Sequence, residues 1–170
     1  AVKLEVNIAG SELDSDGDGT LSMAEFFAFS LRAVRAVQIF MDAEVPEDVR
    51  PDCLVFDATG FGQASDLHAL YDFFHPWIGQ LARNGRVVVL GRPAGTLTQA
   101  SGAAVASALD GFVRSLAKEL GRKGATAHVI YVPEDAEPRL DGLLRFLLSP
   151  RSAFITGQPW TLSALTAPTE

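Results

Sequence analysis

Apolar and polar positions along this chain form two alternating kinds of segment. Short apolar runs predict buried strands at 53–60 and 85–91, and further strands are predicted at 125–133 and within 152–164. Longer segments with apolar residues at helical spacing predict helices at 65–82, 99–124 and 139–150. Apolar strands that alternate with helices are typical of parallel sheets covered on both faces. The pattern therefore predicts a doubly wound α/β fold, with a mostly parallel, Rossmann/flavodoxin-like sheet and helices on both faces.

The helix predicted at 65–82 carries signals for its start and for an interruption. Ser65 or Asp66 is expected as its N-cap, because a short polar side chain can accept a hydrogen bond from the first turn. Pro76 predicts a kink or a break, because it has no backbone N–H to donate. His68 and His75 are seven residues apart, so they share one face and are expected at the surface or at an interface.

Composition narrows the class of protein. The chain has 170 residues, 48% of them hydrophobic and 21% charged, which is typical of one globular domain. A net charge of −7 argues against nucleic-acid binding, which needs a basic face. No apolar run reaches the roughly 18 residues that a membrane span needs, and no secretory signal is visible. The single cysteine, Cys53, is expected to be a small buried residue, and we expect a cytoplasmic protein.

One short stretch, DSDGDGTLSMAE at 14–25, matches the ligand pattern of an EF-hand calcium loop. Such loops take oxygen ligands from positions 1, 3, 5, 7, 9 and 12. The residues at those positions are Asp14, Asp16, Asp18, Thr20 (through its backbone carbonyl), Ser22 and Glu25. Gly19 occupies the place of the sharp turn. The stretch predicts one calcium site, with calcium as the cofactor.

The residues around this loop do not decide which domain the loop belongs to. Residues 2–8 alternate as in a strand rather than a helix, and only one such loop is present, whereas sensor EF-hands usually come in pairs. Residues 1–40 are therefore a strand, an EF-hand-like loop and an exit helix, either as the start of the α/β domain or as a separate calcium module. Residues 41–164 are expected to form the Rossmann-like domain and 165–170 a linker-like tail.

Several segments resemble a known family. The runs DCLVFDATG, GRVVVLG, GFVRSLAKELGRKGATAHVIYVPE and FLLSPRSAFITGQPWTLSA resemble successive segments of the short-chain dehydrogenase/reductase family over roughly residues 50–164. Within it, they are most similar to the degenerate, flavodoxin-like N-terminal domain of the high-molecular-weight 3-oxoacyl-[acyl carrier protein] reductases. The resemblance implies a Rossmann-type domain attached to an NAD(P)H-dependent reductase of acyl thioesters.

The same resemblance implies that the residues for carbonyl reduction are missing. The family uses a Tyr-x-x-x-Lys pair, and the matching positions here are Gly102 and Ala106. The family's catalytic serine falls at Gly91 or Arg92, neither of which has a hydroxyl. None of these four residues can act as a general acid at neutral pH. The resemblance therefore implies no catalytic residue in this chain.

The cofactor site of the family is also altered. The second asparagine of its NNAG motif is Asp57, and its Pro-Gly pair near the nicotinamide is Pro133-Glu134. The glycine-rich phosphate loop is replaced by AGSELDSDGDG, whose carboxylates repel phosphate. These changes argue against NADP as a cofactor and against cofactor-binding residues in this chain.

Three functions remain after these observations. The first is a non-catalytic structural or regulatory domain of a larger 3-oxoacyl thioester reductase that carries one calcium site. The second is an NAD(P)H-dependent reductase that is active only with a partner domain, and the third is a calcium sensor. The resemblance implies that helices 65–82 and 103–121 contact a reductase catalytic domain or a second copy of the chain.

Overall fold

The computed structural model describes residues 50–97, 99–134 and 136–163. The predicted strand at 2–8, the calcium loop at 14–25 and the tail at 165–170 lie outside these residues. The described residues include most of the predicted Rossmann-like domain.

Four strands form one parallel sheet in the order β1-β2-β3-β4. They are β1 (Cys53–Asp57), β2 (Arg86–Gly91), β3 (Thr126–Tyr131) and β4 (Gln158–Thr161). Each strand lies within one of the four predicted segments, so the prediction of parallel strands is confirmed. Strands β1, β2 and β3 are buried, whereas most of β4 is exposed. Because neighbouring strands run the same way, all their carboxyl ends lie along one edge of the sheet.

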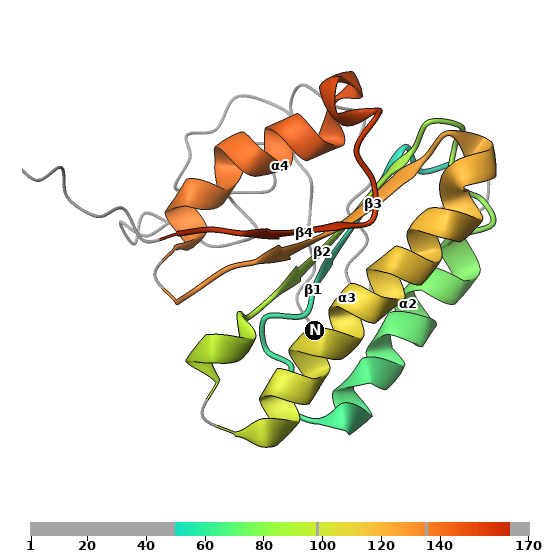
Figure 1. Cartoon of the computed structure of the whole chain (residues 1–170). Coiled ribbons are helices and arrows are strands. Elements are labelled where there is room, and N and C mark those ends of the chain that lie inside the picture. The colour runs from blue at the N-terminus through green and yellow to red at the C-terminus, as the bar shows by residue number, and fades with distance from the viewer. Residues whose placement is uncertain (1–49, 98, 135, 164–170) are drawn as a thin grey trace, which may run out of the picture.

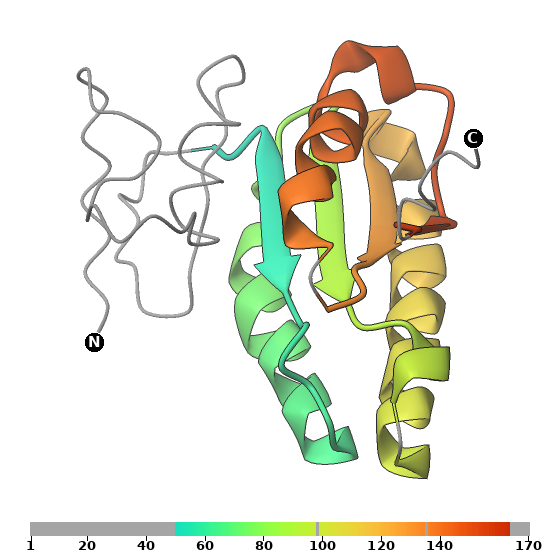
Figure 2. The ribbon, with the colours of Figure 1, turned by 90° about the vertical axis from the view of Figure 1, so that its left-hand side faces the viewer.

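Three helices cover the sheet, and they lie on both of its faces (Figures 1 and 2). They are α2 (His68–Trp77), α3 (Ala100–Leu120) and α4 (Leu140–Leu148). Helices α2 and α3 lie side by side on one face, and α4 lies on the other. The predicted doubly wound α/β class is therefore confirmed for the described part of the chain.

The pleat of the strands divides the interior into two cores, because successive strand residues point to opposite faces. Leu54 and Phe56 of β1 pack with α2 and α3, whereas Cys53 and Val55 pack with α4. The first core also contains the aromatic pair Phe73 and Phe74, whose rings are 4.8 Å apart. Apolar side chains that point to both faces explain why the strands are continuous apolar runs in the sequence.

The helix that the sequence predicts at 65–82 begins later and ends earlier in the structure, where α2 spans His68–Trp77. A 3-10 turn, Ala64–Leu67, precedes α2, and the carboxylate of Asp66 accepts hydrogen bonds from the N–H groups of Gly62 and Gln63 at 2.8 and 2.9 Å. These two bonds lower the pKa of Asp66. Asp66 thus stabilises the turn from within it, and is not the N-cap. Pro76 lies in the last turn, one residue before the helix ends.

Cys53 is buried at the start of β1, as expected. Burial raises the pKa of its thiol to about 12, and the nearby carboxylate of Asp52 acts in the same direction. The side chain is therefore a neutral thiol that fills space in the α4 core. Within the described residues, no helix is long and apolar enough to cross a membrane.

His128 is a buried titratable group on β3. Its ring is fully buried on β3 and accepts a hydrogen bond at Nδ1 from the indole Nε1 of Trp160, at 3.2 Å. Burial lowers the pKa of His128, and the charge of Arg86 adds to this effect, while hydrogen bonding to the backbone of Gln158 and Ile155 opposes it. His128 is therefore neutral in the folded protein at neutral pH.

We expect this histidine to destabilise the fold in acid. As pH falls below the unfolded-state pKa of about 6.5, the unfolded chain binds a proton that the folded chain excludes, so the free energy of unfolding falls by up to about 1.4 kcal/mol per pH unit. Chemical denaturation between neutral and mildly acidic pH measures this slope. His128→Gln should reduce it, whereas His75→Gln on the exposed face of α2 should not. An unchanged slope in His128→Gln, and in His128→Leu as a second variant, would contradict the assignment.

Candidate functional site

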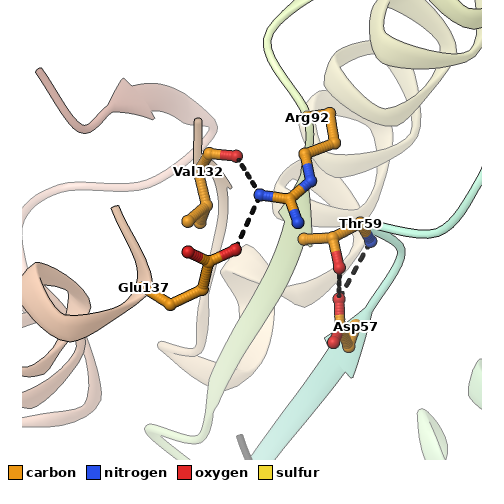
Figure 3. A network of polar contacts seen from close by, with 5 residues as sticks. All are labelled: Asp57, Thr59, Arg92, Val132 and Glu137. Atoms are coloured by element: carbon orange, nitrogen blue, oxygen red, sulfur yellow. Dashed lines mark hydrogen bonds and ion pairs between the residues drawn. The ribbon is translucent and has the colours of Figure 1, made fainter. Parts of the chain in front are cut away.

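The loops that follow β1, β2 and β3 bring polar side chains together at the carboxyl edge of the sheet (Figure 3). Asp57 is the last residue of β1 and Thr59 follows it, Arg92 follows β2, and Glu137 follows β3. In open parallel α/β sheets this edge is where ligands bind. The residues at this edge are therefore the candidate functional site.

Arg92 connects the ends of two neighbouring strands. Its Nη1 donates to the backbone oxygen of Val132 at 2.9 Å and to Oε1 of Glu137 at 2.8 Å. The side chains of Arg92 and Glu137 are only 21% and 30% exposed, so this ion pair is less screened by water than a surface pair. A guanidinium keeps its proton in proteins, so Arg92 can bind or orient an anionic group but cannot supply a proton.

Asp57 shapes the turn that leaves β1. Its Oδ1 accepts hydrogen bonds from the backbone N–H and the hydroxyl of Thr59, at 2.9 and 2.7 Å. The N–H of Ala58 donates to the backbone oxygen of Leu90 at 2.9 Å, which extends the β1–β2 pairing past the strand end. Both contacts fix the position of the carboxylate relative to the end of β2.

Gly91, at the end of β2, lies against the core helix α3. A Cβ at this position would be 2.7 Å from Cδ1 of Leu109 and 3.7 Å from the ring of Tyr131. Leu109 is fully buried, so it has little room to move. The side chain that the resemblance expects here, a serine, has no space in this packing.

Gly102 and Ala106 lie one turn apart on the buried side of α3. A Cβ on Gly102 would meet the side chain of Leu97 at 3.2 Å, and Ala106 is buried. The hydroxyl of Tyr131 donates to the backbone oxygen of Ala106 at 2.7 Å. Burial raises the pKa of Tyr131, and Asp110 acts in the same direction while Arg114 opposes it. Tyr131 therefore stays protonated at neutral pH, with its proton held by a backbone carbonyl.

The sequence identified some of these residues and missed others. Asp57 and Arg92 were singled out through the resemblance, and both lie at the predicted edge. Glu134 was expected as the carboxylate after β3, but the carboxylate that contacts Arg92 is that of Glu137. Thr59 and Tyr131 were not identified, although their places directly after or at the end of a strand were a usable signal.

The metal site that the sequence predicts does not involve the residues that the structure describes. All six predicted calcium ligands, from Asp14 to Glu25, fall outside the described residues. Within residues 50–97, 99–134 and 136–163, no group of three or more His, Cys, Asp or Glu side chains could hold a metal ion. The described part of the chain therefore gives calcium no support.

Comparison with solved structures finds proteins of the same fold. BdcA (YjgI) from E. coli is 28% identical with a TM-score of 0.54, and the match covers 66% of this chain and 60% of BdcA. BdcA in complex with NADPH gives 24% identity and a TM-score of 0.55, over 66% and 64% of the two chains. A blue fluorescent protein from a metagenomic library, in complex with NADPH, gives 22% identity and a TM-score of 0.55 over the same shares. No protein-family model and no curated protein matches the sequence.

The matches overturn the expectation that argued against NADP. BdcA and the blue fluorescent protein share the fold of this chain and were both solved with NADPH. The expectation rested on Asp57, on Pro133-Glu134 and on the stretch that replaces the glycine-rich loop, which falls outside the described residues. Proton transfer and nucleotide binding use different groups, so the loss of the first does not imply the loss of the second.

The close packing at Gly91 can be tested with a double-mutant cycle. Gly91→Ala should destabilise the protein by about 1–3 kcal/mol, because the added methyl group overpacks a filled core. In a Leu109→Ala background the same change should cost at least about 1 kcal/mol less, because the neighbouring atom is gone. Denaturant unfolding measures all four proteins. Gly111→Ala, where nothing lies within 4 Å, is the matched control and should not destabilise. An equal cost of Gly91→Ala in both backgrounds would refute the contact.

The order of the elements and the structural matches agree with each other. The described strands are all parallel, with helices on both faces, and the matched structures have the same arrangement over 66% of this chain. The chain spans only 60–64% of the length of those structures. The described part therefore has the Rossmann-like α/β fold of these structures.

Proposed function

We propose that this chain is an NADPH-binding, Rossmann-like domain that does not itself reduce a carbonyl, and that it serves a larger 3-oxoacyl thioester reductase as a structural or regulatory domain. The observation that carries the proposal is the packing at Gly91, Gly102 and Ala106. The resemblance assigns Gly102 and Ala106 to the tyrosine and lysine of carbonyl reduction, and Gly91 or Arg92 to its serine. In this chain Gly91, Gly102 and Ala106 lie in the packed interior, and Arg92 forms an ion pair with Glu137.

The arrangement around these positions supports the loss of proton transfer. Leu109 and Leu97 lie within 2.7 and 3.2 Å of where side chains on Gly91 and Gly102 would begin. Tyr131, the nearby phenol, is bound to the backbone oxygen of Ala106, so its proton is not offered to a ligand. Arg92, the cation at this edge, cannot act as a general acid.

The support for NADPH comes from the matched structures. BdcA and the blue fluorescent protein have the same fold and were solved with NADPH. At the carboxyl edge of this sheet, Arg92 can attract an anionic group and the polar groups of Asp57 and Thr59 can hydrogen-bond to a ligand (Figure 3). The same matches favour a second candidate, a reductase that becomes active when a partner domain supplies the missing groups.

We also propose that the outer face of α2 contacts the partner, which is a reductase catalytic domain or a second copy of the chain. Tyr71 is 59% exposed there and stacks on His75, with ring centroids 4.6 Å apart. His68 and Asp72 form an ion pair of 3.0 Å on the same helix. Exposed aromatic rings with polar neighbours are common at protein interfaces. Sedimentation of the parent and of Tyr71→Arg tests the second copy, because a dimer through this face should be weakened by the variant.

The proposed function predicts nucleotide binding without turnover. Titration of NADPH, followed by its fluorescence, should show saturable binding to the chain. With a 3-oxoacyl thioester present, the loss of NADPH absorbance should not exceed the protein-free rate, because none of the residues that the resemblance places at the proton-transfer positions can donate the proton. A competent 3-oxoacyl thioester reductase is the positive control for the substrate.

Two results would contradict the proposal, and they differ in meaning. Turnover that scales with the concentration of the chain would refute the non-catalytic assignment and favour the second candidate. If no NADPH binding is seen at the highest nucleotide concentration tested, the nucleotide part of the proposal is refuted. The domain would then have a structural role that does not involve a bound nucleotide.

A further inference from the structure

The amino edge of the sheet, opposite the candidate functional site, collects the carboxyl ends of the helices. In a parallel α/β fold each helix runs back against the strands, so its last carbonyl groups and their partial negative charge lie at this edge. Lys123 donates from Nζ to the backbone oxygens of Gly79 and Leu81, at 2.8 and 3.3 Å, just after α2 ends. Arg86 donates to the backbone oxygens of Ser149, just after α4, and of Asn84. These two cations are thus engaged by backbone carbonyls.

A cavity of about 580 Å³ opens at this edge between three segments of the chain. It is lined by Arg50, Gly79, Gln80, Leu81, Ala82, Arg83 and Lys123. Backbone hydrogen bonds hold the three segments together, from Ala82 to Pro51 and from Asn84 to Lys123, both at 2.9 Å. The cavity is therefore built from anchored backbone, and its size falls within the range of small-molecule sites.

Two arginines that line this cavity have no partner among the described residues. Arg50 and Arg83 make no hydrogen bond or ion pair with any of the described residues. Arg50 and Arg83 are both exposed. Two arginines without a partner among the described residues are not expected to gather in one cavity, because the chain carries a net charge of −7. The positive charge here is a local feature of the fold.

We propose that this cavity binds the phosphate group of a small phosphorylated molecule. Arginine presents a planar fork of N–H donors that matches phosphate oxygens in pairs, and two such forks suit a group of about two negative charges. Lys123 offsets the partial charge at the end of α2, about half an elementary charge, which an incoming anion would otherwise meet. Asp52 is the acidic residue nearest in sequence to Arg50 among the described residues, and it forms no ion pair with it. The volume leaves room for the organic part of the ligand.

This site is separate from the one proposed for NADPH. The cavity lies before the amino ends of β1, β2 and β3, whereas Asp57, Arg92 and Glu137 lie after their carboxyl ends. Strand β2 spans the six residues between the two edges. The inference does not depend on the proposed function, and the test uses no nucleotide, so either can fail alone.

The test is a calorimetric titration with inorganic phosphate and with phosphoserine, at ionic strength held constant with sodium chloride. Both probes should bind the parent chain saturably, and L-serine should not. Arg50→Gln/Arg83→Gln should weaken the binding of both probes at least about tenfold, because two charge-assisted contacts are lost. Arg114→Gln/Lys118→Gln is the matched control, because it removes the same charge from the exposed side of α3. It should bind both probes as the parent does.

Three outcomes would overturn the inference. They are no saturable heat with either probe, equal affinity in the Arg50→Gln/Arg83→Gln variant, and an equal loss in the control pair, which would reduce the effect to overall charge. A far-ultraviolet circular dichroism spectrum and a melting curve of each variant establish that it is folded. If the double variant does not fold, Arg83→Lys replaces it, because lysine keeps the charge but lacks the planar fork and should still weaken phosphate binding.

Discussion

Strand β2 is the element on which the rest of the described structure depends. All six of its residues are buried, because β1 and β3 pair with its two edges and helices cover its two faces. A strand in that position tolerates only apolar residues or fully hydrogen-bonded ones. Arg86 meets this condition by donating to the backbone oxygens of Asn84, Gly85 and Ser149. The pairings of β2 with β1 and β3 fix where those strands leave the sheet, and hence where every polar group at the two edges is held.

The two edges of the sheet differ because all its strands are parallel. At the carboxyl edge the chain turns from strands toward helices, and the polar groups there pair with one another, as Arg92 does with Glu137. At the amino edge the helices end, and their carbonyl groups attract Lys123 and Arg86. At the carboxyl edge, charged side chains are thus compensated by other side chains. At the amino edge they are compensated by backbone carbonyl groups. Arg50 and Arg83 exceed what the backbone at the second edge requires.

The sequence predicted the elements of the described part well, because their signal is local. The strand runs, the long helix at 99–124 and the helix at 139–150 follow from apolar periodicity and from Gly and Pro at their ends. The turn at Asp66 was misplaced because a carboxylate can bind backbone N–H groups from the N3 position as well as from the N-cap. The contact of Arg92 with Glu137, 45 residues away, depends on the β2–β3 pairing and had no local signal.

The candidate site involves two properties, proton transfer and nucleotide binding. The resemblance places Gly91 or Arg92, Gly102 and Ala106 at the proton-transfer positions, where none of them can act as a general acid. The expectation against NADP rested on other residues, Asp57, Pro133-Glu134 and the stretch in place of the glycine-rich loop, and the NADPH-bound structures of the same fold overturn it. Packing explains why the two properties can separate. Leu109 and Tyr131 fill the space beside Gly91, so a reactive side chain there would have to displace the core that holds β2 in place. A nucleotide needs only the strand ends and polar groups outside that core. A well-packed β2 is therefore compatible with polar groups held at the carboxyl edge, such as Arg92 and Glu137.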